Sequence, residues 1–315
     1  VGNTVIAKPS EITPYTAYML GDICNKVGLP KGVLNIINGK GSTVGTKLVS
    51  HKEIKAISFT GGTSTGKIIY KNASNSFKKL SLEMGGKNPA IIFDDCNYDI
   101  MIKTLVRSSF LNQGQICLCS SRILVEKTIY HKFKEDFCKK VSQLVIGNPL
   151  DEDTEFGAIS SKDQYNKIYS YINLAKEEGA KILVGGNKVE LSKPCDKGWF
   201  IGPTVLEGVD QSSKLNQDEI FGPVVTLQSF SSKKDAIQIA NDTIYGLSAT
   251  IWTEDKQKAK DVSSKIDAGV IWINSWLVRD LRTPFGGMKN SGLGREGGME
   301  ILNFFTEQKN ICIPR

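Results

Sequence analysis

One cysteine of the chain lies in a setting that suits a nucleophile. The segment SSFLNQGQICLCSSR places Cys117 just beyond an expected helix and three residues after Gly114, where the missing side chain lets other backbone approach closely. Amide side chains surround this cysteine, and a reactive thiol needs polar, accessible surroundings. From the segment alone, a buried thiol that fills the core is the favoured interpretation, and Cys119, two residues on, is a rival nucleophile.

A glutamate ends the strand expected at KKLSLEMGG. Strand alternation puts Glu83 on the same face as Ser81, with the leucines and the methionine on the other face. One interpretation is a solvated outer face. The other rests on Gly85 and Gly86, which suggest that the strand ends at a crevice, where ligands of open α/β sheets usually bind. In that position Glu83 could act as a general base.

A glycine-rich turn, FTGGTSTGK, joins a strand expected to end at Thr60 to a helix. Backbone N–H groups and the helix dipole at such a turn could bind a phosphate, although the spacing from Gly61 to Gly66 is not G-x-G-x-x-G. A tight turn also needs glycines without any ligand. Lys8 and Glu11, at the end of the first expected strand, could hold ribose hydroxyls or simply face solvent.

Other chemistries lack the residues that they need. Only His51 and His131 are present, and neither stands in a zinc-binding or triad setting, so we expect no metal site. The net charge is +7, but 34 of the 40 basic residues are scattered lysines, so we expect no nucleic-acid partner. Seven cysteines at irregular spacings predict free thiols in a reducing compartment, the cytoplasm.

Length and pattern predict a globular α/β protein with two domains. The 315 residues are 40% hydrophobic and 23% charged, and they contain no apolar run long enough to span a membrane. Residues 1–85 predict consecutive βα units on one parallel sheet, with strands at TVIAKP, VLNIING, AISFTG and KLSLEM. Thr13 as the cap, Pro14 at the first position and Gly28 past the end delimit the first helix.

A second α/β series occupies residues 86–300. Its expected strands are PAIIFDD, RILVE, KILVGG, WFIGPTVL, PVVTLQSF, SATIWT and VIWINS. A helix through Phe133, Phe137 and Val141 has the spacing of a buried face. The glycine-rich segment PFGGMKNSGLGREGG predicts an ordered loop over a site or an interface, and residues 301–315 form the expected C-terminal tail, an oligomerisation segment.

Four motifs, LEMGGKNP, FLNQGQIC, EIFGPV and PFGGMKNSGLGRE, occur in this order along the chain. In this combination the chain resembles the NAD(P)-dependent aldehyde dehydrogenase superfamily over essentially its whole length, and within it the branch that acts on muconic semialdehydes. The resemblance implies that residues 1–85 are the C-terminal half of a Rossmann-type NAD-binding domain and residues 86–300 an α/β catalytic domain. It also implies NAD-dependent oxidation of an aldehyde through a thioester, in a protein that is a homo-oligomer at full length.

The resemblance assigns roles to individual residues. It implies that Cys117, which follows G-Q-x, is the nucleophile in preference to Cys119, and that Glu83 activates the water that hydrolyses the thioester. The cofactor-binding residues that it implies are Lys8, Glu11, Gly41, Thr60, Gly61, Gly62, Gly66, Glu219 and Phe221. Glu11 favours NAD over its phosphorylated form, because a carboxylate there repels a 2′-phosphate.

The substrate residues implied by the resemblance are Arg279 and Phe285. Arg279 lies in a segment that helps line the aldehyde pocket in this family, and a guanidinium can bind a carboxylate through two hydrogen bonds. We therefore expect a small-molecule semialdehyde that carries a carboxylate. Arg282 is close enough to compete, and both arginines could instead be ordinary surface residues.

The departure from the family is at the front of the chain. In the family that the chain resembles, an asparagine that completes the oxyanion hole comes before the position that matches Val1, so we expect either a fragment of a longer product or a shortened paralogue. An inactive structural or binding paralogue is the alternative function. An acyl-transferring relative is a further alternative, against which Glu83 argues, because a hydrolytic base would be wasted there. As given, the chain should leave Val5 and Ile6 on an unprotected edge.

Overall fold

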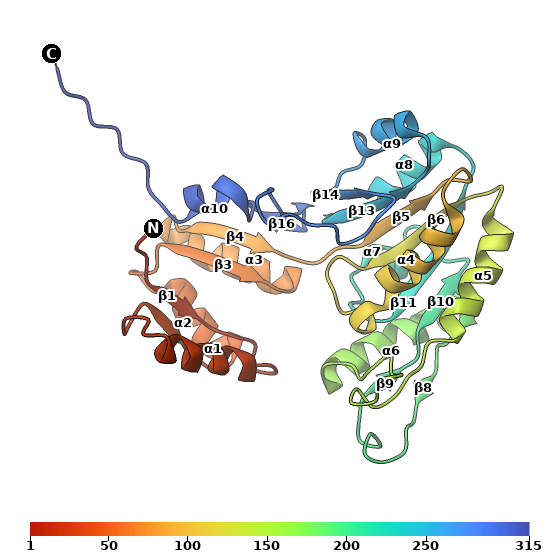
Figure 1. Cartoon of the computed structure of the whole chain (residues 1–315), viewed down its shortest axis with the longest axis horizontal. Coiled ribbons are helices and arrows are strands. Elements are labelled where there is room, and N and C mark those ends of the chain that lie inside the picture. Colours follow the sequence, from red (N-terminus) through yellow and green to blue (C-terminus); the bar gives the residue numbers. More distant parts are fainter. Residues whose placement is uncertain (315) are drawn as a thin grey trace. The chain divides into compact units, whose positions relative to one another are not determined.

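The chain forms two compact units in the computed structural model, which describes residues 1–314 (Figure 1). Unit 1 contains Val1–Glu83, Asp280–Phe285 and the stretch from Leu293 onward, and unit 2 contains Met84–Arg279 and Gly286–Gly292. The division at Glu83 lies two residues from the boundary expected at residue 85. Residues 280–285 and 293–300 belong to unit 1, whereas the expected second domain included them. The roles assigned to the two domains stay predictions.

Unit 1 opens with β1 (Val5–Ala7), α1 (Tyr15–Lys26) and β2 (Leu34–Ile36), and the two strands pair in parallel. Pro14 takes the N-cap position of α1 and makes no side-chain hydrogen bond there, so the expected cap at Thr13 is wrong. Past the helix end, Gly28 has a φ of +79°, the left-handed conformation for which glycine is favoured after a helix.

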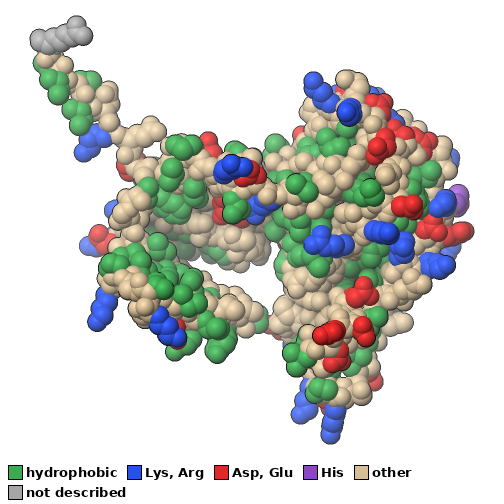
Figure 2. Space-filling model, viewed as in Figure 1, with side chains coloured by type: hydrophobic (Ala, Val, Ile, Leu, Met, Phe, Trp, Pro, Cys, Tyr) green, Lys and Arg blue, Asp and Glu red, His purple; other side chains and the backbone are tan. Residues whose placement is uncertain are grey.

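The first helix of unit 1 buries none of its residues. Its exposed large hydrophobic side chains, part of the apolar surface visible over this region in Figure 2, are Tyr15, Tyr18, Met19, Leu20 and Ile23. Val5 and Ile6 of β1 are also close to half exposed, as expected for this edge.

A second sheet of unit 1 contains β3 (Ala56–Thr60) and β4 (Lys79–Glu83), which pair in parallel. The helix α3 (Thr63–Ala73) lies between them in the sequence. With β16 (Gly292–Leu293) the order is β16-β4-β3. The expectation of one continuous parallel sheet is wrong, because within residues 1–314 no ladder of hydrogen bonds joins β2 to β3. The other elements are η1 (Gly41–Gly45), α2 (Thr46–Ser50), η2 (Ser74–Ser76) and α10 (Gly298–Phe304).

The carboxyl end of β4 is buried on both of its faces. Ser81 and Leu82 point to opposite faces and both are buried, and Glu83 is only 4% exposed. The interpretation of the Ser81 and Glu83 face as solvated is therefore wrong.

Unit 2 is built on a seven-stranded sheet of order β14-β13-β5-β6-β11-β10-β7. All neighbours are parallel except β7, which runs antiparallel to β10 at one edge. The strands are β5 (Asn88–Ile92), β6 (Ser120–Glu126), β7 (Lys181–Val184), β10 (Thr204–Glu207), β11 (Val224–Phe230), β13 (Ser248–Trp252) and β14 (Val270–Ile273). Each of the expected strand segments of this series contains an observed strand.

Helices and short strands complete unit 2. The helices are α4 (Tyr98–Phe110), η3 (Leu111–Gly114), α5 (Tyr130–Ser142), α6 (Lys162–Glu177), α7 (Lys214–Gln217), α8 (Lys233–Asn241) and α9 (Lys256–Ser263). The short strands are β8 (Lys188–Val189), β9 (Phe200–Ile201), β12 (Tyr245–Gly246) and β15 (Met288–Lys289).

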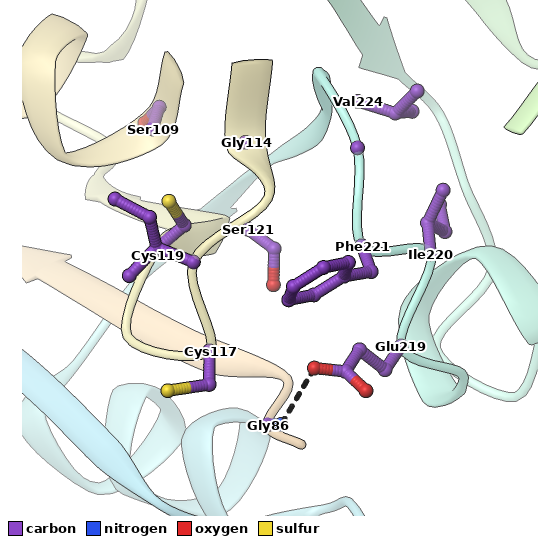
Figure 3. Close-up of a pocket in the computed structure, with 12 residues that line it drawn as sticks. Gly86, Ser109, Gly114, Cys117, Cys119, Ser121, Glu219, Ile220, Phe221 and Val224 are labelled. Atoms are coloured by element: carbon purple, nitrogen blue, oxygen red, sulfur yellow. Dashed lines mark hydrogen bonds between the residues drawn. The ribbon is translucent and has the colours of Figure 1, made fainter. Parts of the chain in front are cut away.

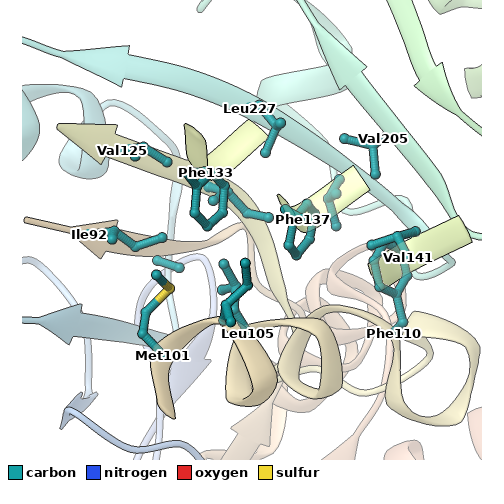
Figure 4. Close-up of a cluster of buried hydrophobic side chains, with 14 of the residues drawn as sticks. Ile92, Met101, Leu105, Phe110, Val125, Phe133, Phe137, Val141, Val205 and Leu227 are labelled. Atoms are coloured by element: carbon teal, nitrogen blue, oxygen red, sulfur yellow. The ribbon is translucent and has the colours of Figure 1, made fainter. Parts of the chain in front are cut away.

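Helices cover both faces of the large sheet. On one face, Phe133, Phe137 and Val141 of α5 pack with residues of α4 against the sheet, as their spacing predicts (Figure 4). On the other face, α8 and α9 pack against a second buried cluster. Successive strand residues alternate between the two clusters, so Ile92 belongs to the first and Ile91 to the second. This two-sided burial is typical of a parallel α/β sheet.

The C-terminal stretch beyond α10 has no regular secondary structure over residues 305–314. Arg315, the last residue of the expected oligomerisation tail, lies outside the described residues, and the role of that tail stays a prediction. No helix in the described part of the chain is long and apolar enough to cross a membrane. Disulfide bonds join none of the seven cysteines, all of which lie within residues 1–314.

Candidate active site

A pocket in unit 2 forms where the segments that precede β5, β6 and β11 meet. These strands are parallel neighbours, so their amino ends lie at the same edge of the sheet. Figure 3 shows Gly86, Cys117, Glu219 and Phe221 on the wall of this pocket, together with Cys119. The pocket is open to solvent, and its empty space, counted together with the solvent at its mouth, is about 330 Å³. The structure thus brings together three of the predicted site residues from distant parts of the sequence.

The loop that carries Cys117 enters through a left-handed backbone turn. Asn112, Gln113 and Gly114 have φ values of +51°, +57° and +67°, a conformation that is uncommon for residues other than glycine and is tolerated best by asparagine. A side chain at Gly114 would collide with the carbonyl of Gly222. The glycine therefore lets the cysteine loop approach the backbone of the EIFGPV segment, as the sequence suggested for this position.

Burial distinguishes the two thiols of the loop. Cys117 is half-buried, whereas Cys119 is 7% exposed, and in Figure 3 their sulfur atoms point in different directions. Burial raises the pKa of the Cys119 thiol to about 12, so almost none of it is thiolate near neutral pH. Cys119 is therefore a poor nucleophile, and its burial argues against it as the rival of Cys117.

The two glycines after Glu83 make room for a carboxylate. A side chain at Gly85 would collide with the carboxylate of Glu219, and the Gly86 N–H donates a hydrogen bond to Glu219 Oε1 at 3.3 Å, drawn as a dashed line in Figure 3. Burial raises the pKa of Glu219. The glycine pair thus lets the carboxylate of Glu219 lie against the backbone that follows β4.

The EIFGPV segment presents Phe221 to the pocket through a strained backbone. Phe221 has a φ of +56°, which is uncommon for an aromatic residue. The side-chain amide of Gln164 stabilises this turn, because its Nε2 donates to the carbonyls of Ile220 and Phe221 at 2.9 and 2.8 Å. Gly222 packs against Ile168, where a side chain would collide.

Two buried cations lie behind this edge of the sheet. Arg122 is fully buried and donates to the carbonyls of Lys87, Ile239 and Ala240 at 2.7–2.9 Å. Lys87 is 2% exposed, and burial lowers its pKa to about 7, with the nearby Arg122 charge acting in the same direction. Neither residue was expected from the sequence, since a lysine after two glycines has no local signal of burial.

Lys87→Met should stabilise the protein near pH 7, and the gain should shrink as the pH rises. The pKa of Lys87 falls from 10.5 to about 7 on folding, so the unfolded chain binds the proton more tightly. The resulting penalty is complete below about pH 7 and disappears as the pH passes 10.5. It is on the order of a few kcal/mol in the free energy of unfolding.

Urea unfolding of the wild type and of Lys87→Met, near pH 7 and near pH 10, measures the difference in their free energies of unfolding. An equal difference at both pH values would contradict the prediction. Asp218 and Glu219, which favour the charged lysine, and Lys167, which disfavours it, are present in both proteins.

Within unit 1, three of the predicted cofactor residues lie together. Lys8 Nζ donates to the carbonyls of Pro9 and Gly39 and lies 3.6 Å from Glu11 Oε2. A hydrogen bond from its own backbone amide lowers the pKa of Glu11, and the Lys8 charge and the Gly41 amide act in the same direction. A cation and an ionised carboxylate are thus held side by side next to the start of η1.

The turn between β3 and α3 lies beside Glu83. Thr60 is opposite Glu83 in the register of the sheet, and the Gly61 N–H donates to the Glu83 carbonyl at 3.0 Å. Gly62 is the N-cap of the 11-residue α3, has no side-chain cap, and has open space where a side chain would stand. Gly66 is buried one turn into the helix. These features fit a phosphate at the helix amino end.

The candidate substrate residues divide between the two units. Arg279 is exposed and is the last residue of the stretch Met84–Arg279 of unit 2. Arg282, in unit 1, forms an ion pair with Asp280, with Nη2 2.5 Å from Oδ2. Phe285 is half-buried and pairs its backbone with Glu296 at 2.7 Å in both directions. Arg282 thus pairs with a carboxylate of its own loop, and the role of Arg279 toward a substrate carboxylate stays a prediction.

Further residues of the pocket were not expected from the sequence. Ser109 and Ser121 line it with hydroxyl groups, and Ser109 is buried at the end of α4. The only local signal for Ser109 is its position four residues after Leu105 on the buried face of that helix. Over the described residues, no group of three or more His, Cys, Asp or Glu side chains could hold a metal ion.

The sequence is similar to a family model and to curated proteins that are all described as aldehyde or semialdehyde dehydrogenases. The sequence matches a family model described as "Aldehyde dehydrogenase family" over residues 1–311. It is 47% identical over 314 residues to a 2-aminomuconic semialdehyde dehydrogenase of Homo sapiens, covering 99% of this chain and 64% of that protein. It is 42% identical over 313 residues to a 2-aminomuconic 6-semialdehyde dehydrogenase of a Pseudomonas species, with the same coverage.

A solved structure has the same fold. The betaine aldehyde dehydrogenase of Staphylococcus aureus in complex with NAD+ is 43% identical, with a TM-score of 0.92 over 94% of this chain and 59% of that chain. The expected α/β fold of this type is confirmed. This chain spans 64% of the length of the curated relatives named above.

Proposed function

The chain belongs to the aldehyde dehydrogenase family, and on that premise we propose that the protein oxidises an aldehyde to a carboxylic acid with NAD as the hydride acceptor. One observation carries the proposal most directly. The pocket of unit 2 holds the more accessible thiol, Cys117, beside Glu219 and Phe221, the residues that match the family's nicotinamide contacts.

Cys117 is the proposed nucleophile. Its thiolate forms a bond to the aldehyde carbon while the carbonyl electron pair moves to oxygen, which gives a tetrahedral thiohemiacetal. A backbone N–H donor, for which the Cys117 amide is the candidate, stabilises the oxyanion. As the carbonyl re-forms, the hydride leaves the carbon and a thioester remains on Cys117.

Glu83 is the proposed base for release of the acid. It removes a proton from a water molecule whose oxygen attacks the thioester carbon, and the carbon–sulfur bond then breaks to regenerate the thiolate. A buried carboxylate three residues before the pocket residue Gly86 in the sequence is consistent with this role.

The residues of unit 1 fit a dinucleotide. The Lys8 and Glu11 pair would hold ribose hydroxyls, and the uncapped amino end of α3 with its open space at Gly62 would hold the pyrophosphate. Thr60 and Gly61 belong to the same turn. NAD, when bound, supplies the hydride acceptor. The carboxylate of Glu11 favours NAD over its phosphorylated form.

The proposed substrate is a semialdehyde that carries a carboxylate, such as 2-aminomuconate semialdehyde. The names of the two semialdehyde dehydrogenase relatives and the exposed cation at Arg279 support this choice. The purified protein should form NADH and acid from this aldehyde, and alkylation of Cys117 should stop the reaction. If the protein neither binds NAD nor forms NADH with any aldehyde, the proposal fails.

Arg279→Ala should reduce kcat/KM about 10- to 100-fold for the acid-bearing semialdehyde, because a charge-assisted hydrogen bond contributes about 1.5–3 kcal/mol. A simple aliphatic aldehyde should be affected little. Arg282→Ala is the matched control, since it removes another exposed guanidinium three residues along the chain. Steady-state kinetics with the two aldehydes measure the effect. Equal losses for both substrates would make Arg279 a structural residue.

A further inference from the structure

Side chains from distant elements hold the loop around Cys117. Residues 115–119 form neither helix nor strand. The carbonyls of Cys117 and Cys119 both accept hydrogen bonds from Asn88 Nδ2, at 2.7 and 2.9 Å, and the carbonyl between them, that of Leu118, accepts one from Trp276 Nε1 at 3.0 Å. Three successive peptide groups are thus oriented by side chains and not by a regular backbone ladder.

The amide of Asn88 is held in a single orientation. Both of its N–H groups are used by the two carbonyls, and its Oδ1 accepts a hydrogen bond from the Ser248 N–H at 3.1 Å. A rotation of the amide by half a turn would oppose oxygen to two carbonyls and nitrogen to an N–H donor. Asn88 is 3% exposed and is the first residue of β5, so water cannot replace these bonds at low cost.

We propose that Asn88 is a positioning residue for Cys117: its amide fixes the carbonyls of Cys117 and Cys119 and thereby the direction of the Cys117 thiol. The inference rests on the proposed function, in which Cys117 attacks the substrate. A nucleophile must be held close to its productive geometry, and a displacement of about 1 Å can cost about 100-fold in rate. The side chain of Asn88 acts only through the loop.

A merely structural role predicts a different outcome, and the chain offers a matched control. Asn216 is also fully buried, its Nδ2 donates to the carbonyls of Val209 and Asp210 at 3.3 and 3.0 Å, and its Oδ1 accepts from Thr226 at 2.7 Å. Replacing either asparagine by aspartate removes two donors from a buried amide. Of the two asparagines, only Asn88 forms hydrogen bonds to the loop that carries Cys117.

The test measures the alkylation rate of Cys117 by iodoacetamide over a range of pH, together with the Tm, in the wild type, Asn88→Asp and Asn216→Asp. Both cysteines of the loop fall in one tryptic peptide, residues 108–122, so fragment ions must assign the label to Cys117. Asn88→Ser, which is neutral and keeps one donor, is the second variant in case Asn88→Asp does not fold.

We expect Asn88→Asp to slow alkylation of Cys117 about tenfold or more, with its pH midpoint moved upward, and Asn88→Ser to slow it less. Asn216→Asp should lower the Tm but leave the rate at Cys117 unchanged. An unchanged rate in both Asn88 variants, or equal slowing in the Asn216 variant, would overturn the inference. A Cys117→Ser protein that still oxidises aldehydes would overturn the proposed function while leaving these alkylation rates interpretable.

Discussion

Cys117→Ser should abolish aldehyde oxidation while leaving NAD binding in place. Only the covalent step needs the sulfur, because a serine hydroxyl without a base is a far weaker nucleophile than a thiolate. We expect a fall of at least about 1,000-fold in kcat. NADH formation with a saturating aldehyde measures the loss, and a titration with NAD followed by protein fluorescence measures binding.

Cys119→Ser is the control for this prediction. Both changes replace sulfur by oxygen in the same loop, two residues apart, but the Cys119 thiol is buried and its pKa is raised to about 12. Its substitution should therefore have only a mild effect on kcat. Equal losses from the two substitutions, or alkylation that spares Cys117, would contradict the choice of nucleophile.

Glu83→Gln should leave the first hydride transfer largely intact and block release of the acid. Without a carboxylate to accept the proton from water, the thioester on Cys117 should accumulate. A burst of NADH close to one equivalent of protein should then precede very slow turnover, and stopped-flow absorbance with mass spectrometry of the acylated peptide measures both.

The exposed Glu53, also in unit 1, provides the control for the same chemical change. Glu53→Gln should behave as the wild type in both phases. If Glu83→Gln shows no burst but keeps its Tm, Glu83 would instead activate the thiol. If the burst is lost and the Tm falls as well, the role of Glu83 is in folding, as its burial at 4% exposure would explain.

Local patterns in the sequence were sufficient to predict most elements of unit 2. Periodicities of two and of 3.6 residues depend only on neighbouring residues, so the strands and the buried face through Phe133, Phe137 and Val141 could be found without the fold. In unit 1 the same local signals located the strands β1 to β4 but not their pairing. They could not show that β2 and β3 belong to separate sheets, because strand pairing is a contact between residues far apart in the sequence.

The candidate site shows the same division. The type and order of its motifs identified Cys117, Glu83 and Glu219 as residues of interest. The residues alone left Cys117 and Cys119 as rivals, and it is burial in the folded loop, through its effect on the Cys119 pKa, that separates them by a physical argument.

Only the tertiary structure showed which residues hold the site in place. Asn88 bonds to carbonyls 29 and 31 residues away, Trp276 to one 158 residues away, and Gly86 to a carboxylate 133 residues away. No local periodicity encodes such pairs, because a buried amide, indole or carboxylate is satisfied by whatever partner the packing of the sheet brings to it. The sequence by itself therefore determined the chemical groups and the elements that carry them, and packing over long sequence separations decided how those groups are oriented.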